Sequence, residues 1–290
     1  MSTSKETVIN YNKKLTSKSK DPVSLILRIL VWCAAALTIM ILFVIIGYIL
    51  YKGIPNLSLD LFDLEYNTQN VSLMPALINT VIMTILSITI AVPLGIFSAI
   101  YLTEYARRGS RLVKIVRITA ETLSGIPSII YGLFGLLFFV TTLHWGFSML
   151  AGGFTLSIMI LPLIMRTTEE ALHAVPDSYR EGSYGLGAGK MRTVFTIVLP
   201  SATPGILAGV ILAIGRIVGE TAALIYTSGT VADIPDSLLS SGRTLSVHMY
   251  ALSSEGLFMD KAYATAVVLI ILVILLNRIS SYTAGKISKS

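Results

Sequence analysis

Apolar residues occur along the chain in long runs, and shorter polar segments separate these runs. A helix needs about 20 mainly apolar residues to cross the hydrocarbon core of a bilayer, which is about 30 Å thick. We expect six such helices, at residues 25–50, 74–101, 119–141, 147–165, 204–226 and 262–277. The pattern therefore predicts an all-α, polytopic membrane protein with six transmembrane helices.

Prolines and glycines predict irregularities within these spans. Pro93 and Pro127 are expected to kink the second and third spans, because each removes a backbone hydrogen bond from the helix. The fourth span has a short apolar run that contains Gly152, Gly153 and Pro162. Its ends are therefore the least well defined by the pattern.

The composition supports a membrane protein. Hydrophobic residues make up 54% of the 290 residues and charged residues only 13%, whereas soluble domains carry about 25% charge. The first apolar run, from Leu25 to Leu50, is too long for the core of a cleaved signal peptide, so we expect it to remain as a span. Cys33, the single cysteine, cannot form an intrachain disulfide, and its place in that run favours a packing role.

Basic residues predict the orientation of the chain. Of the 22 Lys and Arg residues, all but Lys52, Arg216, Arg243 and Lys261 fall in the N-terminal segment, the 102–118 loop, the 166–200 loop or the C-terminal tail. Because basic loops remain in the cytoplasm, both termini are expected there, with tails at residues 1–24 and 278–290. The same distribution explains the net charge of +6 as a topology signal rather than as a nucleic-acid site.

The opposite face carries more acidic residues, and its 227–261 loop is long and polar. This loop could be a docking surface for an external partner or only a solvated connector. The residues of the loop leave both interpretations open.

Arg216 and Glu220 are two charged residues within the predicted fifth span. Charges at bilayer depth are costly, and they are rare unless they face protein or a water-filled path. Their i, i+4 spacing places them on one helical face and predicts an ion pair. One interpretation is a cation on the path of an anion, near the midplane of the bilayer. The other is a structural pair that fixes neighbouring helices.

The 166–200 loop has an ordered pattern of its own. Ser178 and Glu181 have the spacing of a capping box, which predicts a short helix that ends near Gly187 in a left-handed conformation. A second short helix is expected from Lys190 to Val198, because the Leu199-Pro200 step disfavours helix.

Thr203-Pro204 would then start the fifth span, since proline is favoured at the first helical position. Two short helices around a glycine elbow would form either a lever that an outside partner pushes or an interfacial segment without a partner.

The chain shows no catalytic pattern. Tyr184 to Met191 is glycine-rich but lacks the first glycine and the final hydroxyl residue of a Walker A loop. His144, His173 and His248 are scattered without metal-ligand spacing, and no nucleophile elbow is present. We therefore expect a chain that is not an enzyme and holds neither metal nor cofactor.

One set of spacings in the 166–200 loop resembles a known family. Permeases of binding-protein-dependent ABC importers carry the cytoplasmic signature Glu-Ala-Ala-x3-Gly-x9-Ile-x-Leu-Pro. This chain has the same spacing, although two small residues replace the alanines. The matching residues are Glu181, Gly182, Ser183, Gly187, Ile197, Leu199 and Pro200.

Three segments narrow the resemblance further. Residues 125–135, 181–190 and 215–223 are similar to segments of the phosphate-specific ABC transporter, and most similar to its A-type permease, the PstA family. The resemblance covers most of residues 74–277. It implies a type I importer permease domain over that range, with 166–200 as its coupling loop, in a bacterial or archaeal-type cytoplasmic membrane.

The resemblance also implies partners and residue roles. The partners would be a C-type permease, a dimer of cytoplasmic ATPase subunits that holds ATP and Mg²⁺, and an external phosphate-binding protein. Arg216, Glu220 and Thr221 would belong to the phosphate pathway, with Glu220 holding the Arg216 guanidinium. Gly125, Pro127 and Gly132 would serve helix packing and kinking. Coupling to the ATPase would involve Ser178, Glu181, Gly182, Ser183, Gly187, Ile197, Leu199 and Pro200.

Three other functions remain possible at this point. A permease for sulfate, molybdate or a polyamine would differ in the ion that stimulates uptake. A channel or secondary transporter would work without ATP and without the 166–200 lever. A membrane enzyme would need a catalytic constellation, which the sequence does not show.

Overall fold

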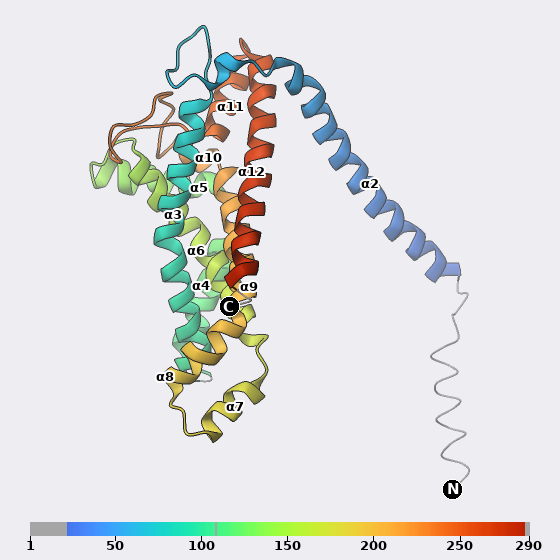
Figure 1. The fold of residues 1–290 in the computed structure, drawn as a ribbon, viewed down its shortest axis with the longest axis vertical. Coiled ribbons are helices and arrows are strands. Elements are labelled where there is room, and N and C mark those ends of the chain that lie inside the picture. The colour runs from blue at the N-terminus through green and yellow to red at the C-terminus, as the bar shows by residue number, and fades with distance from the viewer. Residues whose placement is uncertain (1–21, 108, 288–290) are drawn as a thin grey trace. The chain divides into compact units, whose positions relative to one another are not determined.

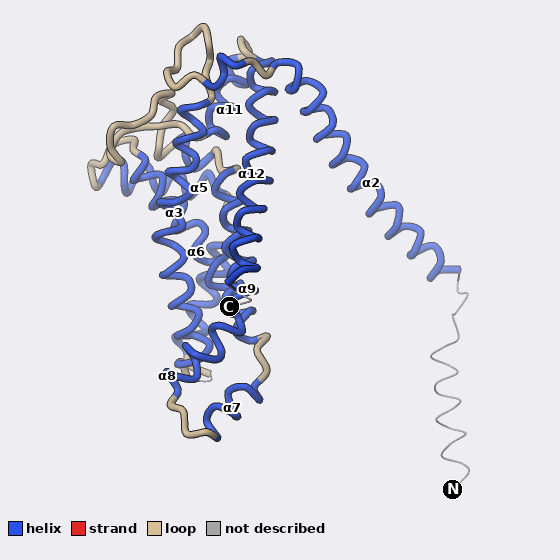
Figure 2. The backbone as a smooth tube through the Cα atoms, in the orientation of Figure 1, coloured by secondary structure: helices blue, strands red, loops and turns tan. Residues whose placement is uncertain are grey.

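The structure is a computed structural model that describes residues 22–107 and 109–287. Helices are the regular elements of these residues, and no strand occurs among them (Figures 1 and 2). The chain divides into two units, residues up to Tyr51 and residues from Lys52 onward. The α-helices are α2 (Pro22–Gly53), α3 (Met74–Ile100), α4 (Arg111–Ser124), α5 (Ser128–Gly135), α6 (Met149–His173), α7 (Asp177–Gly185), α8 (Lys190–Thr193), α9 (Leu199–Val218), α10 (Ala222–Ile225), α11 (Leu245–Glu255) and α12 (Met259–Ile287).

Within the described residues, five helical segments are long and apolar enough to cross a membrane, and the bent pair α4 and α5 could supply a sixth. The five are Pro22–Asn56, Met74–Tyr105, Met149–His173, Lys190–Val218 and Met259–Tyr282. The predicted all-α membrane architecture is confirmed. In the first unit, α2 is apolar all round and its side chains are exposed, which suits a helix surrounded by lipid.

The predicted third span, 119–141, is not one kinked helix. It is two helices that meet at an angle of 102°, with the break at Gly125–Pro127. Gly125 ends α4, and Pro127 adopts an extended conformation (φ −58°, ψ 141°) before α5 begins. The Tyr131 hydroxyl holds the break together by donating to the Leu123 carbonyl at 2.8 Å. A proline cannot continue the hydrogen-bond ladder of α4, so the expected kink becomes a break.

The fourth and fifth spans are longer than predicted. Helix α6 runs from Met149 to His173, so it extends into the predicted 166–200 loop. At the other end of that loop, one helix runs without interruption from Lys190 to Val218. The prediction that a short helix ends at Leu199-Pro200 is therefore wrong, and so is the prediction that the fifth span starts at Pro204.

A π-helical turn at Val194–Val198 explains how the helix passes through Pro200. Leu199 keeps helical angles (φ −64°, ψ −45°), although a residue before proline is usually extended. The wider turn makes room for the proline ring, and the Ser201 hydroxyl donates to the Ile197 carbonyl at 2.7 Å.

The predicted tails also differ from the structure. Helix α12 continues to Ile287, so the tail at 278–290 is helical over its described part. The predicted tail at 1–24 lies outside the described residues, except for 22–24, which are in α2.

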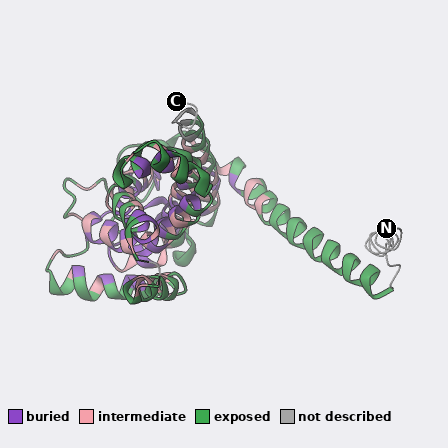
Figure 3. Ribbon diagram, turned by 90° about the horizontal axis from the view of Figure 1, so that it is seen from below, coloured by how far each residue is buried: buried purple, intermediate pink, exposed green. Residues whose placement is uncertain are grey.

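Buried residues gather in the interior of the second unit (Figure 3). Most of those in the two largest apolar clusters belong to α3, α6 and α9. The largest apolar cluster also includes Tyr131 from α5, Leu224 from α10 and Val247 from α11. Gly132 permits a close approach of α5 to α10, because a Cβ atom there would lie 2.9 Å from the Ala223 Cα. Backbone atoms cannot rotate away, so this position needs glycine.

Replacing Gly132 with valine is expected to lower stability by about 1–3 kcal/mol, because the new side chain forces α5 away from α10. The measurement is the thermal unfolding midpoint of the protein in detergent. Gly215→Ala is the matched control, since a Cβ there meets nothing within 4 Å. Equal midpoints for Gly132→Val and the unmodified protein would contradict the tight contact.

Candidate functional site

Helices α7 and α8 form an elbow at one end of the second unit, and α10 and α11 lie at the other end (Figure 1). The predicted capping box at the start of α7 is wrong. The helix begins at Asp177 after Pro176, and no side chain caps its first amides. Ser178 already lies inside the helix, so it cannot act as the capping residue, while Asp177 supplies the negative charge that suits a first turn.

The turn after α7 confirms the predicted left-handed conformation of Gly187. Gly187 has a φ of +82°, in the left-handed region. The Ala188 amide donates to the Ser183 carbonyl at 3.1 Å, and the Gly187 amide donates to the Tyr184 carbonyl at 2.9 Å. These two bonds form a Schellman motif, in which glycine is strongly preferred.

The residues of the coupling signature separate into two groups. Ser178, Glu181 and Gly182 are exposed on α7, as is Gly187 in the turn. Ser183 is buried, and its hydroxyl lies 2.8 Å from the Thr193 hydroxyl of α8, so the two helices of the elbow are held together. The other group comprises Ile197, Leu199 and Pro200, which belong to the continuous helix from Lys190 to Val218.

This continuous helix connects the elbow directly with Arg216. At 1.5 Å per residue, Lys190 and Arg216 are about 40 Å apart along it. Arg216 lies in the last turn of α9 and is exposed. The elbow and Arg216 are thus the two ends of one helical rod, an arrangement that the predicted break at Pro200 excluded. The placement of Arg216 near the midplane of a bilayer stays a prediction.

The predicted ion pair between Arg216 and Glu220 is wrong, because α9 ends at Val218 and the i, i+4 geometry is lost. Glu220 is 9% exposed, and its Oε1 accepts a hydrogen bond of 3.1 Å from the Ala223 amide. The Ser246 hydroxyl donates to the Glu220 carbonyl at 2.6 Å. Glu220 therefore holds the start of α10 and joins it to α11.

Arg216 is left without a carboxylate partner in the part of the chain that the structure describes. It lies near Tyr131, the residue that fixes the break between α4 and α5. Thr221 is half-buried in the break between α9 and α10. Arg216, Thr221 and Tyr131 therefore lie around two neighbouring helix breaks.

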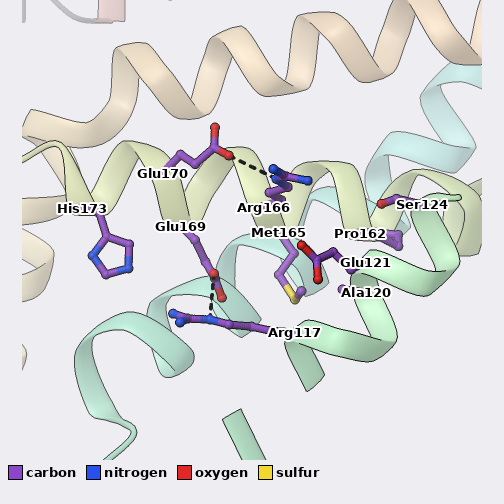
Figure 4. A pocket seen from close by; sticks show the side chains of 10 residues that line it. All are labelled: Arg117, Ala120, Glu121, Ser124, Pro162, Met165, Arg166, Glu169, Glu170 and His173. Atoms are coloured by element: carbon purple, nitrogen blue, oxygen red, sulfur yellow. Dashed lines mark hydrogen bonds and ion pairs between the residues drawn. The ribbon is translucent and has the colours of Figure 1, made fainter. Parts of the chain in front are cut away.

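A cavity of about 320 Å³ lies between α4 and α6 (Figure 4). Arg117 contacts Glu169 across it at 3.3 Å, and Arg166 pairs with Glu170 along α6 at 3.1 Å. These pairs use two of the three carboxylates that line the cavity, and Glu121 adds one negative charge beyond them. No group of three or more metal-ligating side chains occurs among the described residues.

The segment 227–244 folds over the N-terminal end of α6. The amides of Ser148, Met149 and Leu150 donate to carbonyls of Thr227, Ser240 and Leu238. These bonds satisfy amides that the first turn of a helix leaves free. The segment is therefore anchored to the bundle, and its use as a docking surface stays a prediction.

Arg243, near the end of this segment, and His248 of α11 are both buried. The Arg243 guanidinium lies 4.7 Å from the centre of the Tyr66 ring, and that ring meets the His248 ring edge-on at 6.1 Å. Neither His248 nitrogen has a hydrogen-bond partner among the described residues. Burial, and secondarily the Arg243 charge, lower the pKa of His248 from 6.5 to about 3.

The protein is expected to lose stability as the pH falls from about 6.5 toward 3. In that interval unfolded protein binds a proton at His248 that folded protein excludes, so stability is complete above 6.5 and falls below it. The loss is on the order of 4 kcal/mol. Unfolding midpoints across this pH range measure it. His248→Phe should weaken the dependence, and an unchanged pH profile would contradict this prediction.

Sequence reasoning missed Tyr131, Thr193 and Glu104. Glu104 offered a signal in the sequence, because it is a carboxylate at the end of an apolar run. In the structure its side chain is only 6% exposed and pairs with Arg180. Tyr131 and Thr193 offered none, because their roles depend on contacts made through the fold.

Comparisons with known proteins agree with this architecture. Residues 91–288 match the family model described as "Binding-protein-dependent transport system inner membrane component". The "Probable ABC transporter permease protein YqgI" of Bacillus subtilis is 31% identical over 273 residues, with 88% of this chain and 92% of the relative covered. The "Phosphate transport system permease protein PstA" of Pasteurella multocida is 36% identical over 240 residues, with 78% and 81% covered.

Solved structures are similar in fold. A bacterial alginate ABC transporter, in complex with a pentasaccharide-bound periplasmic protein, aligns with a TM-score of 0.64 at 18% identity and covers 92% of this chain and 98% of the other. The MetNI methionine ABC transporter in an inward-facing conformation aligns with a TM-score of 0.58 at 20% identity and covers 74% and 94%. The type I importer permease fold and the family resemblance seen in the sequence are both confirmed.

Proposed function

Because the chain belongs to the family of inner membrane components of binding-protein-dependent transport systems, we propose that it is the A-type permease subunit of an ATP-driven phosphate importer. Relatives named as phosphate permeases support the substrate: those of Pasteurella multocida and Yersinia pestis are 36% and 35% identical to this chain. The permease domain comprises residues 74–277, with 166–200 as the coupling loop.

The main support for an anion pathway is the environment of Arg216. It is exposed near the outer end of an apolar helix and has no carboxylate partner among the described residues. A charge at membrane depth is stable only where it faces protein or water. The exposed face of α9 therefore faces a second permease subunit across a water-filled path, and a guanidinium suits phosphate oxygens there.

The face of α9 that carries Arg216 fits this role. Leu212, one turn before Arg216, is exposed on the same side of the rod. Thr221 adds a hydroxyl at the outer end, and Glu220 holds the break that leaves Arg216 accessible. Phosphate passes along this side, between the A-type subunit and a C-type partner.

The elbow is the contact for the cytoplasmic ATPase dimer. Ser178, Glu181 and Gly182 are exposed on α7 and can enter a cleft of the partner, while Ser183 fastens α7 to α8. ATP and Mg²⁺ bind to the ATPase and supply the energy. This chain contributes the lever and the pathway and has no ATPase site of its own.

The continuous helix explains how the two ends of the protein communicate. When the ATPase dimer closes on ATP, it pushes the elbow, and the rod from Lys190 to Val218 moves as one body. Arg216 then turns from one side of the membrane toward the other. The permease is a two-state element that ATP biases on one face and a loaded binding protein biases on the other.

The orientation follows the basic residues. The elbow and both termini lie in the cytoplasm, and the segments 57–73 and 227–261 lie outside. The outer segment at 227–244 exposes Ile234, Leu238 and Leu239 beside Asp233 and Asp236. This mixed apolar and acidic surface is the contact for the phosphate-binding protein.

The proposal is tested by the ATPase activity of the reconstituted complex. This chain is assembled with the C-type permease, the ATPase and the binding protein in lipid vesicles. Phosphate-loaded binding protein should stimulate ATP hydrolysis several-fold, and sulfate in place of phosphate should not. Equal stimulation by both anions would reject phosphate specificity, and stimulation without this chain would reject its role.

A further inference from the structure

A buried ion pair connects the elbow with the end of α3. A π-helical turn, Tyr101–Tyr105, ends this helix, and it carries Glu104. The Glu104 Oε1 accepts hydrogen bonds from Arg180 Nη2 at 2.7 Å and from Arg180 Nε at 3.2 Å. The two side chains are 6% and 14% exposed. A carboxylate is almost never buried to this extent unless it is paired, so the contact is a specific one.

Arg180 also fixes the base of α7. Its Nη1 donates to the Val175 carbonyl at 2.9 Å, and its Nη2 donates to the Leu172 carbonyl at 2.9 Å. Asp177 accepts a further bond from Nη1 at 3.3 Å. One guanidinium therefore joins the end of α6, the start of α7 and the end of α3.

The residue that follows Glu104 contacts the other half of the elbow. The Lys190 ammonium, at the start of α8, lies 5.2 Å from the centre of the Tyr105 ring. Such a contact is attractive because the face of an aromatic ring is electron-rich. Glu104 and Tyr105 thus contact α7 and α8 respectively, and the Ser183–Thr193 contact closes the elbow between them.

Glu104 and Tyr105 are the last two residues of the π-helical turn, and the chain becomes extended at Ala106. The Ala106 amide closes the turn by donating to the Tyr101 carbonyl at 2.9 Å. A cavity of about 700 Å³ adjoins the pair and is lined by both Glu104 and Arg180, which leaves room for movement there.

We propose that Glu104 and Tyr105 form a clasp that makes α3 move together with the elbow. This inference rests on the proposed function, because it assigns a transmission role within the same importer. The rod through α9 delivers the push to Arg216, and the clasp delivers it to α3, which packs against α6 and α9. Helices α3 and α9 then change position together. Glu104 and Tyr105 are positioning residues, since they do not touch phosphate.

The first test is the number of phosphate ions transported per ATP hydrolysed by the reconstituted complex. Glu104→Gln removes the charge of the carboxylate and should lower this ratio by roughly tenfold, the value of one charge-assisted hydrogen bond. Tyr105→Leu should lower it less, and Glu104→Asp, which retains the charge, should restore part of it. ATP hydrolysis itself should continue.

Glu170→Gln is the matched control. It removes the carboxylate of the Arg166–Glu170 pair, whose side chains are 63% and 67% exposed, and should leave the ratio unchanged. If Glu104→Gln and Tyr105→Leu both keep the ratio of the unmodified protein, the clasp is not a transmission element. A loss of protein from the membrane with an unchanged ratio in the remaining protein would also overturn it.

The second test does not depend on the substrate. In a Cys33→Ser background, spin labels are placed at the exposed positions Tyr101→Cys on the end of α3 and Tyr179→Cys on α7. The distance between them should be the same with and without ATP and vanadate, and Glu104→Gln should make it change on ATP binding. A distance that changes equally in both proteins would overturn the clasp. Absence of phosphate uptake by the unmodified complex would reject the proposed function alone.

Discussion

Replacing Arg216 with glutamine is expected to reduce phosphate uptake by roughly a hundredfold or more, because a charge-assisted contact to an anion is worth up to about 3 kcal/mol. Glutamine keeps two polar atoms but has neither the charge nor the paired N–H donors of a guanidinium. Arg216→Lys retains the charge, so its phosphate uptake should lie between that of the unmodified protein and that of Arg216→Gln. Uptake by reconstituted vesicles, corrected for the amount of protein, measures the effect.

Arg278→Gln is the control for this prediction. It makes the same chemical change at an exposed arginine on α12, away from the proposed path, and should leave uptake unchanged. If Arg216→Gln transports phosphate normally at the same protein level, Arg216 has only a structural role. A cation in the last turn of a helix stabilises the unpaired carbonyl groups there, and that role would then account for it.

The second large effect is expected from Gly187→Val. A β-branched residue in the left-handed region is strained by at least about 1–2 kcal/mol, so the Schellman turn between α7 and α8 should rearrange. The ATPase should then hydrolyse ATP without driving transport, because its push no longer reaches the rod. The measurement is the ratio of uptake to ATP hydrolysis, which should fall by roughly tenfold or more.

Two further variants separate backbone strain from simple bulk at this turn. Gly187→Asn should retain most of the coupling, since asparagine tolerates the left-handed conformation better than other side chains. Gly189→Ala should behave like the unmodified protein, because its φ is −73° and a Cβ there meets nothing within 4 Å. Unchanged coupling in Gly187→Val would show that the elbow does not transmit force.

The membrane architecture could be predicted from the sequence because it depends on composition and run length. The left-handed conformation of Gly187 could be predicted because it depends only on the local sequence. The helix through Pro200 could not: local preference favours an end at Leu199, but packing of Val198 and Ala202 in the core keeps the segment helical. Burial outweighs the backbone preference at this position, and a π-helical turn accommodates the proline.

The charged residues show a second limit of sequence reasoning. The i, i+4 rule for Arg216 and Glu220 assumes an unbroken helix, and the turn at Gly219 removes that condition. Glu220 then caps α10 instead of holding Arg216. The partner of Glu104, Arg180, lies 76 positions away in the sequence, so no local rule could have identified the pair.

The continuous rod changes the expected mechanism more than any other feature. A lever joined to the fifth span by a flexible Pro200 step would lose motion at that joint. The helix from Lys190 to Val218 is continuous, so in the proposed mechanism a displacement of the elbow would reach Arg216 without a hinge. The clasp at Glu104 and Tyr105 would extend the same displacement to α3, so that both sides of the pathway respond to one event.

The most direct test of the account is ATP-dependent uptake of labelled phosphate into vesicles that contain this chain, the C-type permease, the ATPase and the binding protein. Sulfate serves as the competing anion, and the complex without this chain is the control. The account predicts saturable phosphate uptake that requires this chain and is unaffected by excess sulfate. Absence of phosphate uptake, or equal uptake of sulfate, would contradict the assignment of phosphate as the substrate and of Arg216 as its site.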